Sequence, residues 1–187
     1  MGYAYYYNRA RNKYYDACSK INSCENKINQ LKIQRQQKIN QINQLKTDIK
    51  NHENAFDEVS ELIKGEENLN EKVLGISNKT NQSAVNFSGM VYSSNITNKN
   101  LDDVYGVETT NTKQTLNNIL QALKAKKNEL SIKIANLKKE LHRAESELQD
   151  IENSIRTTQS DLQSWKRAKK NASIDMAYYR RKMDEED

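Results

Sequence analysis

Residues 130–151 have the sequence LSIKIANLKKELHRAESELQDI, and this stretch decides the fold. Its apolar residues recur at alternating steps of four and three, beginning with Leu130, Ile134, Leu137 and Leu141. Such steps place these residues on one side of an α-helix, which is the pattern of a coiled-coil seam. Charged and polar residues fill most of the other positions. The stretch therefore predicts a solvated helix that packs on another helix along a narrow apolar stripe.

The same register continues outward from this stretch, back to Leu116 and forward to Met183. A second register of the same kind begins at Tyr3 and continues without a slip to Ile63. Polar residues inside a seam commonly fix its register, or extend their charged ends toward solvent. We interpret in this way the three plainly polar seam residues of the first segment, which are Arg35, Lys38 and His52.

Two heptad segments of similar length predict an all-α fold, a long antiparallel two-helix coiled-coil hairpin with a partly folded cap at the bend. At 1.5 Å per residue, each helix would be roughly 90 to 110 Å long. Two separate helices that each pair with another chain remain an alternative. We expect a single domain over residues 1–187, divided into a helix over 3–64, a cap or connector over 65–110, a helix over 111–183 and an acidic tail over 184–187.

The connector is rich in Asn, Ser, Thr and Gly. Gly65 and Gly75 are candidate helix stops, because glycine readily takes the conformation that ends a helix. A structureless loop of this length is uncommon, so we expect part of it to be folded. The sequence leaves the fold of residues 65–106 open.

Composition limits the class of protein. The chain has 187 residues, no proline, 35% hydrophobic and 29% charged residues, and a mean hydropathy of -1.01. This profile favours extended helices over a deep core. No stretch approaches the ~18 apolar residues of a membrane span, and the N-terminus lacks the apolar region of a secretory signal. We expect a cytoplasmic protein, or one exported with a partner by a route that needs no signal peptide.

The sequence offers little for catalysis. It contains no Gly-rich phosphate loop, no HExxH and no GxSxG. Cys18 and Cys24 are too far apart around a helix to bridge each other, and His52 and His142 supply no ligand cluster. We therefore expect a protein that is not an enzyme, with no catalytic residues, no metal site and no cofactor.

Aromatic and basic residues gather near both ends of the chain, which a hairpin would bring together. Tyrosine, tryptophan and arginine are enriched at protein-binding hot spots. Several of these aromatics continue the seam, and Trp165 is one of them, whereas four tyrosines lie off it. The predicted partner-binding residues are Tyr5, Tyr6, Tyr15, Trp165, Tyr178, Arg180 and Arg181.

Nucleic acid is a competing partner, since the pI is about 9.0 and aromatic rings can stack on unpaired bases. The formal net charge of +5 is modest for 187 residues, however, and acidic residues are interspersed along both segments. Charge of this kind is typical of a solvated helix, which makes nucleic acid the less favoured partner.

Two short segments resemble known families. Phe87-Ser88-Gly89 resembles the Trp-x-Gly element at the bend of WXG-type proteins, the small helical hairpins of type VII secretion in Gram-positive bacteria. Residues 3–11, YAYYYNRAR, are similar to the starts of small helical partners of LXG-domain toxins. The chain departs from the WXG pattern in having Phe for Trp, in its greater length, and in lacking a tyrosine followed four residues later by an acidic residue.

The resemblance implies an adaptor that binds the helical domain of a secreted LXG-like effector and assists its export. Two other hypotheses stay open. The chain could be a self-associating structural coiled coil, or it could bind single-stranded nucleic acid.

Overall fold

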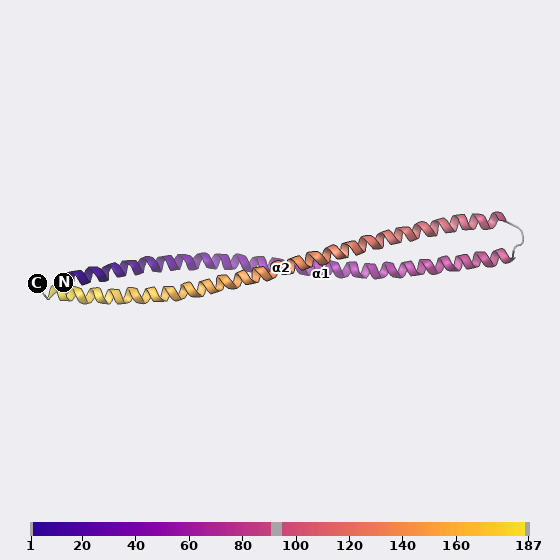
Figure 1. Ribbon diagram of the computed structural model, residues 1–187. Helices are drawn as coiled ribbons and strands as arrows, with labels where there is room; N and C mark the ends of the chain where they lie inside the picture. Colours follow the sequence, from indigo (N-terminus) through magenta and orange to yellow (C-terminus); the bar gives the residue numbers. More distant parts are fainter. Residues whose placement is uncertain (1, 91–94, 186–187) are drawn as a thin grey trace. The chain divides into compact units, whose positions relative to one another are not determined.

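The computed structural model consists of two helices, α1 (Tyr3–Met90) and α2 (Asn95–Asp184) (Figure 1). It describes the backbone of residues 2–90 and 95–185, and the side chains of most residues in 2–76 and 110–185. Helices of this length are possible because the chain has no proline to interrupt their hydrogen bonds. The all-α fold predicted from the heptads is confirmed.

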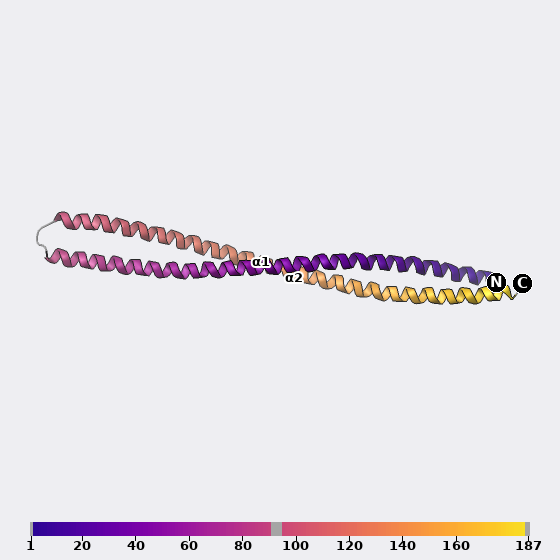
Figure 2. The same cartoon turned by 180° about the vertical axis from the view of Figure 1, so that it is seen from behind.

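The chain divides into two compact units where we expected a single domain. Unit 1 comprises residues 1–46 and 140–187, and unit 2 comprises residues 47–139. Within each unit, a segment of α1 lies antiparallel to a segment of α2, as the two opposite views show (Figures 1 and 2). Each unit is therefore a pair of helices with one seam between them, as a helical hairpin requires.

Unit 1 has a seam of small and branched side chains. Four of its seam positions hold alanine, and these side chains are at most 4% exposed. Small residues allow two helix backbones to approach closely, so the seam is filled without large side chains at these levels. The buried residues of this unit are Ala10, Ala17, Ile21, Ile28, Ile42, Leu45, Ala144, Thr158 and Ala172.

Unit 2 has a seam of the same kind. Ile49, Ile63, Leu130 and Leu137 are its buried residues, with 7 to 8% of each exposed. Half-buried Phe56 lies beside Lys127, whose ammonium is 5.0 Å from the centre of the aromatic ring. The lysine thus keeps its charge near solvent while its stem covers the seam.

Burial confirms both predicted registers. Every position assigned to the two seams is buried or half-buried, with the exception of the exposed Arg35. The α1 register also continues past its predicted end, through half-buried Glu66, Asn70 and Val73. The seam is thus longer than the apolar pattern alone indicated.

The predicted ends of the helices were wrong. Gly65 and Gly75 lie inside α1 and have no positive φ, so neither residue ends the helix. The expected cap or connector over 65–110 is helical up to Met90 and again from Asn95, and α2 begins well before residue 111. Of the expected acidic tail 184–187, Asp184 ends α2 and Glu185 forms a turn, while residues 186–187 lie outside the described residues. Continued packing of the two helices explains why the glycines are tolerated, since each costs a helix only about 1 kcal/mol.

Candidate functional site

Four tyrosine rings form a connected cluster at the end of unit 1 that carries both termini. Tyr6 of α1 stacks on Tyr179 of α2, with ring centres 5.5 Å apart and planes at 23°. Tyr5 meets Tyr6 edge to face at 5.4 Å, and Tyr178 meets Tyr179 in the same manner at 5.2 Å. The rings therefore make a continuous aromatic surface that crosses from one helix to the other.

The outer members of this cluster face solvent. Tyr5 is 52% exposed and Tyr178 is 48% exposed, whereas Tyr6 is 36% exposed and Tyr179, a seam residue, is half-buried. Tyrosine has few rotatable bonds, and its ring combines apolar area with a polar hydroxyl, so it suits a binding surface. The stack on Tyr179 fixes Tyr6 in place and supports the two exposed rings beside it.

A second aromatic group lies about two helical turns further along the pair. Tyr14 and Tyr15 meet edge to face at 5.7 Å. The Arg11 guanidinium lies 5.7 Å from the Tyr15 ring centre, and the Lys169 ammonium lies 5.3 Å from the Tyr14 ring centre. We call the two groups together the aromatic pole, which consists of Tyr5, Tyr6, Tyr14, Tyr15, Tyr178 and Tyr179.

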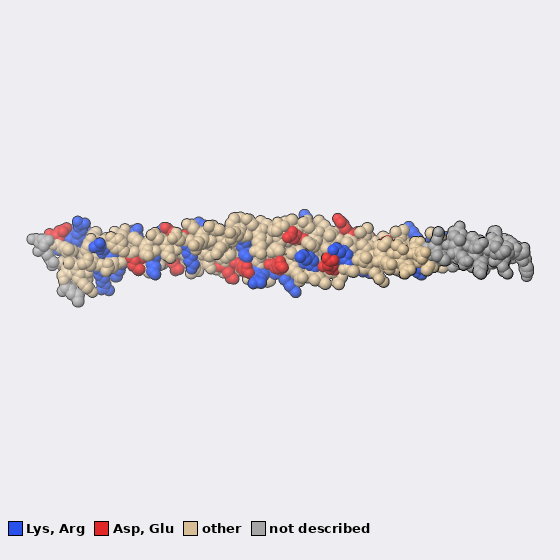
Figure 3. All heavy atoms as spheres, turned by 90° about the horizontal axis from the view of Figure 1, so that it is seen from above, with Lys and Arg blue, Asp and Glu red and all other residues tan. Residues whose placement is uncertain are grey.

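The aromatic pole is also basic. Residues 3–20 and 165–185 contain eleven Lys and Arg residues against four Asp and Glu residues. Blue side chains are visible at this end of the molecule in the space-filling view (Figure 3). Arg9, Arg180 and Arg181 are exposed and form no ion pair with any residue that the structure describes. The pole thus offers cations as well as rings to an incoming partner.

Neighbouring polar groups raise the pKa of two lysines that lie beside the aromatic pole. Glu185 accepts a hydrogen bond from the Lys182 ammonium and attracts its charge, which raises the pKa of Lys182 above its ordinary value. Electrostatic interaction with Cys18, and then with Tyr14, also raises the pKa of Lys169.

The structure brings most of the predicted partner-binding residues together. Tyr5, Tyr6, Tyr178, Arg180 and Arg181 all belong to the terminal end of unit 1, and Tyr15 lies in the second aromatic group. Trp165 does not join them. It is half-buried in the seam, about 21 Å along α2 from Tyr179, and makes no ring contact within the described part of the chain.

The predicted bend motif cannot be placed in the same way. Phe87, Ser88 and Gly89 fall in the last turn of α1, and their side chains lie outside the described residues.

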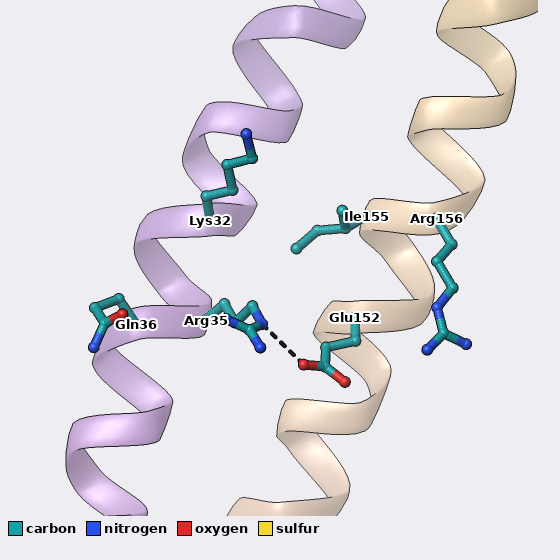
Figure 4. A pocket seen from close by; sticks show the side chains of 6 residues that line it. All are labelled: Lys32, Arg35, Gln36, Glu152, Ile155 and Arg156. Atoms are coloured by element: carbon teal, nitrogen blue, oxygen red, sulfur yellow. Dashed lines mark hydrogen bonds and ion pairs between the residues drawn. The ribbon is translucent and has the colours of Figure 1, made fainter.

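Arg35 takes the place of an apolar residue at one position of the unit 1 seam. The Arg35 Nε donates a hydrogen bond to the Glu152 Oε1 at 2.8 Å, and an open groove of about 500 Å³ surrounds this pair (Figure 4). Lys32, Gln36, Ile155 and Arg156 also line the groove. This set lacks a nucleophile beside a base and lacks a second carboxylate, so it offers no arrangement for acyl or proton transfer.

The described residues form neither a metal-binding cluster nor a membrane-spanning helix. No group of three or more His, Cys, Asp or Glu side chains lies close enough to hold a metal ion in the described part of the chain. Cys18 and Cys24 are free thiols. Over the same residues, neither helix contains a stretch apolar enough to cross a bilayer.

One feature of both units was missed from the sequence. Four ion pairs link α1 to α2 along one edge, and each partner directly follows a seam residue on its own helix. In a heptad whose seam positions are a and d, the position directly after d is called e. Charges of opposite sign at the e positions of the two helices were the signal in the sequence for these ion pairs. The pairs are Glu25–Lys166 and Lys46–Glu145 in unit 1, and Glu53–Lys138 and Glu67–Lys124 in unit 2.

No protein-family model, curated protein or solved structure matches this chain.

Proposed function

We propose that this chain is a non-enzymatic binding protein whose aromatic pole docks a helical segment of another protein. The observation that supports the proposal is the connected cluster of Tyr5, Tyr6, Tyr179 and Tyr178, whose outer rings are about half exposed. Aromatic rings beside arginines are the residues that carry most of the energy in protein interfaces. A surface held by two packed helices also loses little conformational freedom on binding.

The partner that we propose is the helical domain of a secreted, LXG-like effector. The support is the resemblance of residues 3–11 and 87–89 to the type VII secretion proteins described above. In this role the chain is an adaptor that meets the effector in the cytoplasm and presents it for export. In this role the adaptor leaves the cell together with its effector.

Co-expression with the helical domain of an LXG-type toxin encoded beside this gene tests the proposal. The variant Tyr5→Gln/Tyr178→Gln removes the exposed rings and leaves the Tyr6–Tyr179 stack in place. Because hot-spot truncations each cost about 1 kcal/mol or more, we expect its affinity to fall at least about tenfold.

A matched control is Ile33→Gln/Ile132→Gln, which removes two side chains that are 60% and 56% exposed and lie away from the pole. This control should bind as the unmodified chain does. Failure of the unmodified chain to co-purify with the effector domain, or equal binding by the two double variants, would refute the proposal.

Binding of single-stranded nucleic acid is a second candidate, favoured by the excess of basic residues beside the exposed rings of the pole. It predicts that affinity for a single-stranded oligonucleotide falls steeply between about 50 and 200 mM salt. A mobility-shift assay measures this, and the absence of a shift at the lower salt concentration excludes it.

A further inference from the structure

Unit 2 carries an exposed apolar stripe beside its seam. Leu62, Leu69 and Ile76 follow one another on α1 at steps of seven residues and are 58%, 51% and 64% exposed. Leu62 and Leu69 directly precede the seam residues Ile63 and Asn70, which is the heptad g position, and Ile76 follows at the next step of seven. Ile119 holds the g position of α2 and is 44% exposed.

These four residues lie on one edge of the helix pair. The ion pairs Glu53–Lys138 and Glu67–Lys124 join the e positions of the two helices and therefore mark the opposite edge. The g positions of α1 and α2 consequently share the other edge, where Asp48, Lys126 and Lys133 accompany the exposed apolar side chains. We call Leu62, Leu69, Ile76 and Ile119 the g stripe.

A two-helix seam does not need apolar residues at g. Seam positions a and d alone give the narrow stripe of a coiled coil, whereas apolar a, d and g positions are typical of a helix that faces more than one neighbour in a bundle. A stripe that repeats every seven residues along a helix fits an α-helix laid alongside it. The geometry of unit 2 thus matches one half of a larger helical bundle.

The charges of the two helices indicate which partner packs against the g stripe. In the described parts of unit 2, α1 residues 47–76 contain eight acidic and three basic residues, while α2 residues 110–139 contain seven basic and one acidic. A second copy related by a two-fold axis can place its basic α2 against the acidic α1 of the first, and its acidic α1 against the basic α2. Such a surface complements itself, as a two-fold interface requires.

We propose that unit 2 is a self-association element, in which two copies of this chain pack g stripe against g stripe to form a four-helix bundle. Leu62, Leu69 and Ile119 form the apolar centre of the interface, and the acidic α1 of each copy lies beside the basic α2 of the other. The proposal concerns a different surface from the aromatic pole, so the failure of either one leaves the other standing.

Sedimentation equilibrium of the full chain, over roughly 1 to 200 µM, tests the proposal in the concentration range expected for a small interface. We expect a reversible equilibrium between monomer and dimer. The variant Leu69→Gln should raise the dissociation constant at least about tenfold, because one half-exposed leucine per copy no longer becomes buried.

Ile132→Gln is the matched control, since Ile132 is 56% exposed on α2 of the same unit but lies outside the g stripe. It should leave the dissociation constant within about twofold of the unmodified value. Far-UV circular dichroism of both variants checks that each keeps its helices.

Salt provides a second measurement. Opposite charges on facing helices attract more strongly at low ionic strength, so the dimer should be tighter at about 0.05 M than at about 0.5 M salt. A monomer across the whole concentration range, an equal effect of Leu69→Gln and Ile132→Gln, or tighter association at high salt would each overturn the proposal.

Discussion

Arg35 and Lys38 occupy seam positions, yet their charged ends do not lie in the seam. Arg35 reaches Glu152, and the Lys38 ammonium lies 2.7 Å from the Glu147 Oε2. His52 has its hydrogen-bond partner within its own helix, since its Nδ1 lies 2.7 Å from the Asp48 carbonyl oxygen. At the residue scale, Arg35, Lys38 and His52 thus each find a partner for their polar groups, and the two cations do so with carboxylates of the facing helix.

Glu147 offers a measurable consequence of this arrangement. A hydrogen bond and the charge of Lys38, followed by those of Arg143, lower the pKa of Glu147 below its ordinary value of 4.5. A lowered carboxyl pKa contributes stability that is present above the ordinary value and is lost as the pH falls through the lowered one. We expect Glu147→Gln to lower the melting temperature at pH 7, and we expect this effect to vanish as the pH falls through the lowered pKa of Glu147.

Thermal unfolding followed by circular dichroism, at several pH values, measures this difference. Glu140→Gln is the matched control, because Glu140 is an exposed residue of α2 that forms no ion pair with the residues described. A pH-independent effect of Glu147→Gln would show that its ion pairs contribute nothing to stability, as is common for exposed pairs.

At the scale of the helices, tertiary packing decided what local signals could not. Gly65 and Gly75 carried the local signature of a helix end, and the Asn-, Ser- and Thr-rich segment after them suggested a cap. The helix continues because its seam continues, through half-buried Glu66, Asn70 and Val73. The partly polar character of this stretch also explains why an apolar pattern underestimated the length of α1.

Substitution of the two glycines therefore tests directly whether α1 continues through residues 65 and 75. A Cβ at either position would meet no atom within 4 Å. Since Gly costs a helix interior about 0.5 to 1 kcal/mol relative to Ala, Gly65→Ala and Gly75→Ala should each stabilise the protein by about that amount. Urea unfolding followed by circular dichroism provides the measurement.

The exposed Ala125 of α2 supplies the converse control. Ala125→Gly should destabilise by a similar amount, about 0.5 to 1 kcal/mol. Destabilisation by Gly65→Ala or Gly75→Ala would instead mean that the glycine adopts a backbone conformation that alanine resists, as in a helix end.

At the scale of the whole molecule, the heptads of the sequence were enough to predict two helices, their antiparallel packing and the residues of the seam. They also placed Tyr5, Tyr6 and Tyr178 at a common end. The stacking of Tyr6 on Tyr179, and which charges at the e positions pair with one another, could not be predicted, because both depend on how far one helix is shifted along the other. A period of seven is satisfied by several such shifts, and only the packed pair selects one.

Each unit is a helix pair with a narrow seam, and this determines how the molecule should unfold. Each seam residue packs only on neighbours at its own level, so a destabilising substitution in one unit should affect mainly that unit, as in repeat proteins.

Trp165, the only tryptophan of the chain, is half-buried in unit 1 and reports on that unit alone. Ile63→Ala removes a buried side chain of unit 2, at a cost of about 2 kcal/mol or more. We expect this variant to lower the midpoint of the first unfolding transition measured by circular dichroism. The midpoint of the transition measured by Trp165 fluorescence should stay unchanged. Ile21→Ala, which alters an equally buried residue of unit 1, should lower the fluorescence midpoint. Equal shifts of that midpoint in both variants would instead show that the two units unfold as one cooperative block.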